Sequence, residues 1–491
     1  MTSLLQYLKN ESNLTFTENG AVTNKSTGDY NIDLFATIGA IRHLTDEEII
    51  NRFVRAYAED KDIAMKIIFY ARDIREGLGE RRVFRVILNW LANNHPETVN
   101  KNLKYVGEYG RYDDLLCVFG TPCETTAMEI IKEQLNKDLT AMAENKEISL
   151  LGKWLPSINT SNEDAVANAK RIAKYLNMNA RDYRKTLSSL RAYIKIIENN
   201  LRLRDYTFDY SKQPSNAMTK YREAFMRNDL ERYKSYLDSV NKGEAKMNTG
   251  NVYPYQLVQP YTDWYNRHIS EEEKLSVNTT WANLPDYGGD EDILAVIDGS
   301  GSMYWCSTPS PASVALSLGL YFAERNKGAF ANHFITFSER PQLVELKGET
   351  FLDKLRYAMT FDEVANTNLE AVFTLILNTA VKNKLSQSDM PAKLVIISDM
   401  EFDSCVRDGS LTNLQNAKLI YEQYGYKLPE IVFWNVNSRN TQQPVTRNES
   451  GVALVSGCTP KLFSMIAGGI VDPYAFMLEI LNKPRYECIT A

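Results

Sequence analysis

Cysteine and histidine are scarce and scattered in this chain of 491 residues. The six cysteines form no C-x-x-C pair, and they stand at Cys117, Cys123, Cys306, Cys405, Cys458 and Cys488. The four histidines show no pair at metal-ligand spacing, and they stand at His43, His95, His268 and His333. These absences argue against a disulfide framework, a zinc site and histidine-centred catalysis. They favour reduced thiols and a cytoplasmic protein.

Long hydrophobic runs are absent as well. No stretch approaches the roughly 20 apolar residues that cross a membrane as a helix. The first residues, Met1-Thr-Ser-Leu-Leu-Gln6, lack the basic and apolar regions of a signal peptide. With 44% hydrophobic and 24% charged residues, the composition is that of a globular protein, and the length suits two or three domains. We therefore expect a cytoplasmic protein with no membrane partner.

A short run of oxygen-bearing side chains, Asp298-Gly-Ser-Gly-Ser302, follows the apolar stretch Ile293–Ile297. The apolar stretch predicts a buried strand, and the intervening glycines let the backbone turn tightly around an ion. One carboxylate and two hydroxyls are ligands that a hard cation such as Mg²⁺ prefers. The alternative is an ordinary turn in which the Asp and Ser side chains cap the next helix.

Two further candidate ligands lie downstream. The apolar stretch Lys393–Ser398 is followed by Asp399, and the polar loop Asn366-Thr367-Asn368 precedes a predicted helix. The predicted metal ligands are Asp298, Ser300, Ser302, Thr367 and Asp399. Their order resembles the metal-ion-dependent adhesion site of von Willebrand factor A domains. The resemblance implies a bound Mg²⁺, or another divalent cation such as Mn²⁺ or Ca²⁺, with one open position for water or for an acidic group of a partner.

The chain divides into a helical first part and a mixed second part. Helical periodicity runs from about Asp46 to Leu237 and predicts the successive antiparallel helices of an α-solenoid. Pro, Gly and Asn interrupt residues 247–292. From Asp292 onward, apolar strands alternate with helices, which predicts a doubly wound, mostly parallel sheet. We expect an all-helical domain at 1–265, a linker at 266–284, and a von Willebrand A-like α/β domain at 285–491.

Positive charge is concentrated in residues 165–246, which hold 18 Lys and Arg against 9 Asp and Glu, in a chain of net charge −6. On one predicted helix, an apolar stripe from Leu187 to Leu201 runs beside a cationic row that reaches Arg202. Such rows suit a phosphate backbone. The predicted RNA contacts are Lys170, Arg171, Lys174, Arg181, Arg184, Lys185, Arg191 and Lys195. The alternative is a solvated helix face.

Acids and bases are nearly balanced in a second charged stretch, residues 71–82. Structural ion pairs explain this balance sufficiently, so we rank its arginines as weaker RNA-binding candidates; they are Arg72, Arg75, Arg81 and Arg82.

Several short motifs are spread along the chain from about residue 30. They are Ala71-Arg-Asp-Ile-Arg-Glu-Gly-Leu-Gly-Glu80, Gly110-Arg-Tyr-Asp-Asp114, Lys153-Trp-Leu-Pro-Ser157, Arg181-Asp-Tyr-Arg-Lys185, Pro214-Ser-Asn-Ala-Met218, Lys220-Tyr-Arg222, Ser398-Asp-Met-Glu-Phe-Asp403, Phe433-Trp-Asn435 and Val455-Ser-Gly457. With these motifs the chain resembles the TROVE proteins, to which the Ro autoantigen belongs. It is more similar to an uncharacterised TROVE-related branch found in bacteria, plants and large viruses. The resemblance implies HEAT-like helical repeats that curl into a ring closed by the A domain, and small structured or misfolded non-coding RNA as the ligand.

Three classes of function are consistent with these features. The first is a monomeric, Ro-like RNA-binding ring protein, and the second is a metal-dependent protein-interaction scaffold that binds no RNA. The third is an enzyme, which we do not expect. An aspartate-nucleophile phosphatase needs a second acid two residues after Asp298, where this chain has Ser300. Asp399, Glu401 and Asp403 leave a two-metal acid cluster as the enzymatic alternative.

Overall fold

A computed structural model of the chain describes residues 12–262, 268–304, 308–361, 367–404 and 411–491. It divides into two compact units. The sheet unit comprises Met1–Thr45, Arg52–Ile67 and Val252–Arg485, and the helical unit comprises Asp46–Asn51, Ile68–Asn251 and Tyr486–Ala491. Within the described ranges, no helix has the length and apolar character needed to cross a membrane.

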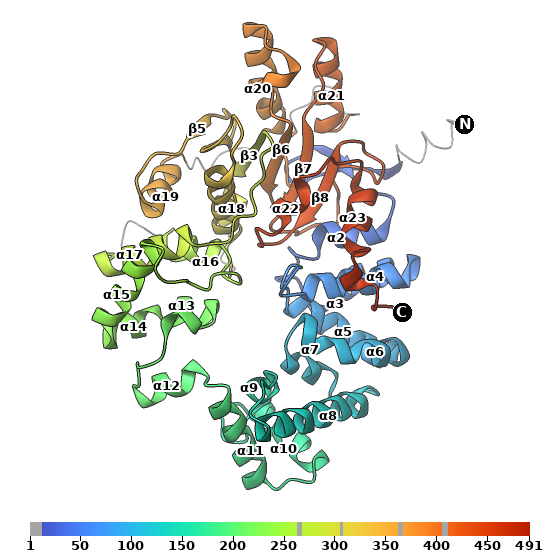
Figure 1. The fold of residues 1–491 in the computed structure, drawn as a ribbon. Helices are drawn as coiled ribbons and strands as arrows, with labels where there is room; N and C mark the ends of the chain where they lie inside the picture. Colours follow the sequence, from blue (N-terminus) through green and yellow to red (C-terminus); the bar gives the residue numbers. More distant parts are fainter. Residues whose placement is uncertain (1–11, 263–267, 305–307, 362–366, 405–410) are drawn as a thin grey trace. The chain divides into compact units, whose positions relative to one another are not determined.

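A six-stranded sheet is the centre of the sheet unit (Figure 1). Its strands are β3 (Ile293–Asp298), β4 (His333–Phe337), β5 (Leu343–Glu345), β6 (Lys393–Ser398), β7 (Glu430–Asn435) and β8 (Val452–Ser456). Their order across the sheet is β5-β4-β3-β6-β7-β8, and every neighbouring pair is parallel except β4 and β5. The mostly parallel sheet predicted from the sequence is therefore confirmed.

The two central strands are buried along their whole length. All six residues of β3 and all six of β6 are buried, and Val296 lies opposite Ile396 in the parallel register. Apolar β-branched residues dominate both strands because neither face of a central parallel strand meets water. The strand order reverses between β3 and β6, so their carboxyl ends form the topological switch point at which such sheets hold ligands.

Helices lie between the strands and after the last one, and most of them begin at a side-chain cap. They are α18 (Pro311–Arg325), α19 (Phe351–Met359), α20 (Leu369–Asn383), α21 (Asn413–Gln423), α22 (Leu462–Ile466) and α23 (Pro473–Leu481). Asn368 caps α20 by accepting from the Ala371 amide, and Thr412 forms a capping box with Gln415 at the start of α21. Helix α18 packs against β3, β4 and β6.

The N-terminal segment packs with the sheet. Strands β1 (Leu14–Phe16) and β2 (Val22–Asn24) form an antiparallel hairpin, and α2 (Tyr30–Thr37) packs against β8 and α23. By its contacts this segment belongs to the sheet unit, although the sequence places it next to the helical stretch. Helix α16 (Tyr255–Val258) also belongs to this unit, as does α17 (Glu271–Ala282), which occupies most of the segment expected as a linker.

The helical unit is built from short helices with one apolar face. The helices α3 (Asp46–Glu59) and α4 (Lys61–Arg72) come first, and each has residues in both units. The helices that lie wholly in the helical unit are α5 (Arg82–Asn94), α6 (Pro96–Asn102), α7 (Val106–Tyr109), α8 (Glu124–Ala143), α9 (Leu151–Trp154), α10 (Glu163–Tyr175), α11 (Ala180–Tyr193), α12 (Ile197–Leu203), α13 (Ser215–Lys220), α14 (Arg222–Asn228) and α15 (Leu230–Asn241). On α5, the buried face holds Val83, Phe84, Ile87, Leu88 and Leu91 at helical spacing.

One sequence prediction about this unit is wrong. The apolar stripe from Leu187 to Leu201 predicted a single helix, whereas the structure has two, α11 and α12. Lys195 lies between them with a left-handed φ of 51°. A left-handed residue ends a helix, because its backbone cannot continue the right-handed hydrogen-bond pattern. The cationic row predicted along one helix is therefore interrupted at Lys195.

The contact between α2 and β8 depends on a residue without a side chain. A Cβ on Gly39 would lie 2.7 Å from the Ser456 backbone and 2.8 Å from Gly457 Cα. Because backbone atoms cannot move aside cheaply, we expect Gly39→Ala to lower the free energy of unfolding by roughly 1–3 kcal/mol.

Urea denaturation measures this effect. Gly468→Ala is the matched control, since a Cβ there meets nothing within 4 Å. Equal midpoints for the two variants would show that the N-terminal segment does not pack tightly on the sheet.

Candidate metal centre and basic surface

The Asp298 carboxylate is held at the end of β3 by hydrogen bonds from the Ser300 amide and the Ser398 hydroxyl. It is 1% exposed, its Oδ1 accepts from the Ser300 amide at 2.8 Å, and its Oδ2 accepts from the Ser398 hydroxyl at 2.5 Å. The Ser300 and Ser302 hydroxyls are 3.1 Å apart. Three of the predicted ligands, Asp298, Ser300 and Ser302, thus lie together at the switch point. Ser398, which the sequence did not indicate, is a further residue of this group.

Asp399 directly follows β6, which pairs with β3 in parallel from Lys393 to Ile397. It is 2% exposed, and its Oδ1 accepts from the Glu401 amide at 3.2 Å. Its Oδ2 accepts from Arg439 Nη2 at 3.1 Å. Arg439 was not found from the sequence, because nothing local marks the arginine of a distant loop as the partner of this carboxylate.

The two carboxylates influence each other. Burial, and then repulsion by Asp399, raises the pKa of Asp298 to about 7, although three hydrogen bonds oppose the rise. Burial also raises the pKa of Asp399, against the opposing effects of Arg439 and Ser302. Two buried carboxylates that repel each other are an environment in which a bound cation lowers the electrostatic energy.

Thr367 joins this group through Glu401. Its hydroxyl donates to the Glu401 carbonyl at 3.0 Å and accepts from the Asn19 side-chain amide at 3.4 Å. The structure thus places it beside the residues that follow Asp399, with no direct bond to Asp298. Asn366, the neighbour in the predicted polar loop, lies outside the described residues. Within the described ranges, no group of three or more His, Cys, Asp and Glu side chains is arranged so that it could hold a metal ion, so the candidate donor set depends on hydroxyls as well as carboxylates.

The N-terminal hairpin, residues 14–24, closes one side of the site. Glu401 is 3% exposed, and its carboxylate accepts from the Glu18 amide at 2.8 Å and from the Asn440 side chain at 2.9 Å. Glu18 pairs with Arg439 at 3.0 Å, so one guanidinium links the hairpin to Asp399. The spacing Asp399-x-Glu401 was the only sequence signal for this arrangement, and it does not reveal the hairpin.

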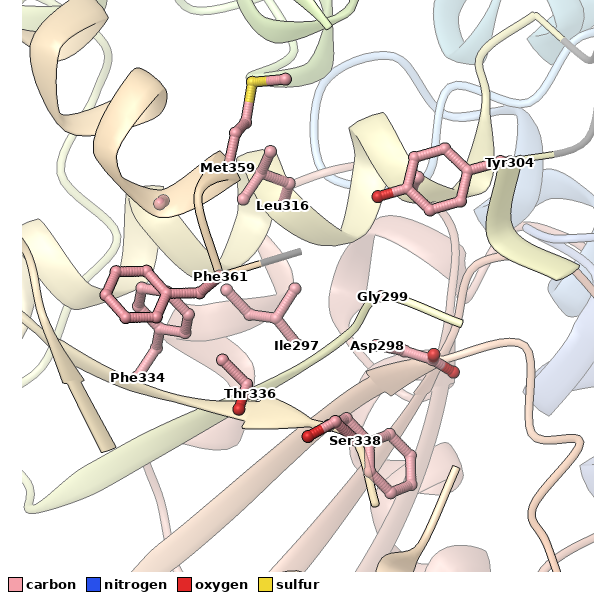
Figure 2. A pocket seen from close by; sticks show the side chains of 13 residues that line it. Ile297, Asp298, Gly299, Tyr304, Leu316, Phe334, Thr336, Ser338, Met359 and Phe361 are labelled. Atoms are coloured by element: carbon pink, nitrogen blue, oxygen red, sulfur yellow. The ribbon is translucent and has the colours of Figure 1, made fainter. Parts of the chain in front are cut away.

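A pocket with mainly apolar walls adjoins Asp298 (Figure 2). Figure 2 shows Asp298 and Gly299 at one end of the pocket, with Phe334 and Phe361 toward the other. The pocket is a hollow beside the buried carboxylate, between residues of α18, β4 and α19.

The charged stretch 71–82 forms ion pairs within the helical unit, as its balanced composition indicates. Arg72 is 2% exposed and bonds Asp114 through both Nε and Nη2 at 2.7 Å. Arg81 pairs with Asp113 at 2.9 Å, and Arg82 pairs with Asp46. The structural explanation of these arginines is therefore confirmed.

Most of the predicted RNA-binding side chains are exposed. The exposed ones are Lys170, Arg171, Lys174, Arg181, Arg184, Lys185 and Lys195. Arg171 pairs weakly with Glu124, at 3.5 Å. Lys170, Arg171 and Lys174 stand on α10, and Arg181, Arg184 and Lys185 on α11. Two neighbouring helices thus carry six exposed cations.

Arg191 is different from the other predicted contacts, because it points into the unit. Nε donates to the Gly152 carbonyl, Nη1 to the Ser157 hydroxyl and Nη2 to the Leu155 carbonyl, each at 2.8 Å. Burial lowers the pKa of its guanidinium. The cationic periodicity did not distinguish this residue, because a sequence does not show which side of a helix receives a loop.

Fold and site together define a two-unit protein, in which a helical unit accompanies a mostly parallel α/β unit with buried carboxylates at its switch point. The chain belongs to the family described as "Domain of unknown function (DUF2828)", whose model matches residues 17–116 and 125–286. A second model, "Domain of unknown function (DUF7788)", matches residues 292–472.

Two known proteins are similar along most of the chain. "Uncharacterized protein L728" of Acanthamoeba polyphaga mimivirus is 30% identical over 513 residues, which cover 96% of this chain and 88% of that protein. The crystal structure of the Deinococcus radiodurans Ro (RSR) protein matches with a TM-score of 0.46 and 13% identity, over 85% of this chain and 93% of that one.

Arg191 offers a test of its inward role. Arg191→Lys keeps the charge but removes the planar fork that reaches three acceptors, so we expect a loss of roughly 1–3 kcal/mol in unfolding free energy. Arg184→Lys, on the exposed face of the same helix, should stay within about 0.5 kcal/mol of the parent. Chemical denaturation of both variants checks this expectation, and a neutral Arg191→Lys would return Arg191 to the candidate RNA surface.

Proposed function

We propose that this protein is a Ro-like RNA-binding protein whose sheet unit is a von Willebrand A-type domain with a divalent-cation site. The observation that supports the cation site best is the pair of carboxylates, Asp298 and Asp399, buried at the adjoining ends of β3 and β6. Parallel sheets hold ligands at this point. The resemblance of the sequence motifs to TROVE proteins supports the proposal of a Ro-like protein. HEAT-like repeats, closure into a ring and a monomeric state are further parts of this proposal.

The donor set at the switch point fits a hard divalent cation. Asp298, Ser300, Ser302 and Asp399 would hold it, and Thr367 would support the loop next to Asp399. Carboxylate and hydroxyl oxygens are what Mg²⁺ and Mn²⁺ prefer. A bound cation would supply a docking point for an acidic group of a partner. We propose no catalytic role, since the chain offers no second acid in the place of Ser300.

Exposed cations support the proposal of RNA binding. Six of them stand on α10 and α11 in a segment of net charge +9, while the chain as a whole is acidic. Lys and Arg on such a surface contact phosphates without regard to base sequence. We therefore propose small structured or misfolded RNA as the ligand class, held through its backbone.

The cation site predicts a stabilisation by Mg²⁺ that depends on Asp298. At a free concentration about 100 times Kd, a ligand that binds only the folded state adds about 2.7 kcal/mol to the unfolding free energy. We expect MgCl₂ to raise the thermal midpoint of the wild type, and Asp298→Asn to remove this rise. Thermal unfolding in MgCl₂ and in NaCl of equal ionic strength measures the difference.

Glu422→Gln serves as the control, because Glu422 is an exposed acid on α21, away from the switch point. It should keep the full response to Mg²⁺. An Asp298→Asn variant that responds as the wild type does would contradict the proposed site.

The basic surface predicts RNA binding that weakens with salt. For single strands, each neutralised phosphate contributes about −0.7 to the slope of log K against log salt. We expect Arg184→Ala/Lys185→Ala to weaken binding of a short single-stranded RNA and to make the slope shallower by about 1.4. Fluorescence anisotropy at several salt concentrations measures both quantities.

Lys132→Ala/Lys137→Ala removes two exposed lysines from α8 of the same unit and is the matched control. It should leave the slope unchanged. If the wild type binds no RNA at low salt, the second candidate remains, a scaffold that binds an acidic protein partner through the cation. Such binding would be abolished by chelation and would tolerate moderate salt.

A further inference from the structure

Arg222 is a buried arginine for which the proposed function has no role. It is the first residue of α14 and ends the motif Lys220-Tyr-Arg222. Only 8% of the residue is exposed. Burying a guanidinium is unfavourable unless it is paired and hydrogen-bonded.

Two of its nitrogens are without partners. Nε and Nη2 of Arg222 are buried, and neither has a hydrogen-bond partner among the described residues. These two nitrogens form one edge of the planar guanidinium. Their parallel N–H bonds match two oxygens of a phosphate or a carboxylate in a bidentate arrangement.

Three other arginines of the helical unit, Arg72, Arg111 and Arg191, have the Nε and Nη2 edge satisfied by groups of the chain. Arg72 uses the same edge, Nε and Nη2, on the Asp114 carboxylate. Arg111 uses it on both oxygens of Asp113, at 2.9 and 2.5 Å. Arg191 bonds two carbonyls and a hydroxyl. Against this pattern, the empty edge of Arg222 indicates a ligand that does not belong to the chain.

The surroundings favour a phosphate as that ligand. Arg222 lies in the segment of net charge +9, and Lys220, two residues before it, is exposed. Lys220 Nζ lies 5.0 Å from the centre of the Tyr221 ring, so its charge is held near the start of α14. A phosphate carries more charge than a carboxylate, so a segment rich in cations favours it.

We infer that Arg222 is a binding site for a phosphate group, held by the Nε and Nη2 edge of its guanidinium with Lys220 as a second cation. Arg222 stands on α14, whereas the proposed RNA surface is on α10 and α11. The phosphate group can belong to an RNA backbone or to a free phosphate compound. Inorganic phosphate is therefore a sufficient probe.

Thermal unfolding of the full chain in sodium phosphate, against sodium chloride of equal ionic strength, tests the site. We expect phosphate to raise the midpoint of the wild type. Arg222→Met removes an unpaired buried charge and keeps an apolar chain of similar length. It should unfold at a higher temperature than the wild type in chloride, and phosphate should not raise it further.

Arg227→Met, at an exposed position of the same helix, is the control and should respond to phosphate as the wild type does. Arg222→Lys keeps the charge without the fork, so its phosphate affinity should fall roughly tenfold. A phosphate response that survives in Arg222→Met would overturn the inference. A lower midpoint of Arg222→Met in chloride would also overturn it, since the arginine would then be satisfied within the chain, for example by Glu198, whose Oε2 is also unpartnered.

A second arm separates the two sources of phosphate. A short single-stranded RNA is titrated against the wild type and Arg222→Met in the same buffer. Weaker RNA binding by the variant assigns the site to an RNA phosphate, and equal RNA binding together with a lost phosphate response assigns it to a free phosphate compound. Because the phosphate arm needs no RNA, failure of the RNA proposal does not affect this site.

Discussion

Two carboxylates buried side by side at the point where the strand order reverses are the constraint on which the sheet unit depends. Asp298 and Asp399 are each at most 2% exposed. The chain meets this constraint with donors, which come from Ser398, the Ser300 amide and Arg439. Each donor belongs to a different loop or strand end, so the carboxylates fix the positions of several segments at once.

The same constraint explains why the N-terminal hairpin packs where it does. Arg439 bonds both Asp399 and Glu18, and Glu401 accepts the Glu18 amide. Residues more than 370 positions apart in the sequence are thus joined by charged hydrogen bonds, which are stronger than neutral ones. In the helical unit, arginines have a comparable organising role. Arg72 holds the Asp114 carboxylate, and Arg191 holds the loop that contains Gly152. In Arg222, by contrast, Nε and Nη2 have no hydrogen-bond partner among the described residues.

The sequence predicted the sheet unit well because its signals are local. Apolar stretches with many β-branched residues mark β3 and β6, and the strand predicted at Ile293–Ile297 agrees with β3 to within one residue. Three of the predicted ligands lie together around Ser300. What the sequence could not show depends on long-range packing. The hairpin and Arg439 are far apart in the sequence, and Arg191 points inward to a loop. The left-handed backbone of Lys195 divides the predicted helix, although the apolar stripe continues past it.

The most direct test of the central claim, that the switch point binds a divalent cation, is anomalous diffraction from a crystal of the full chain soaked in Mn²⁺. If the switch point binds a divalent cation, a manganese peak will lie within bonding distance of the Asp298 carboxylate and the Ser300 and Ser302 hydroxyls. A crystal that binds Mn²⁺ elsewhere or not at all, with Arg439 still bonded to Asp399, would contradict this claim.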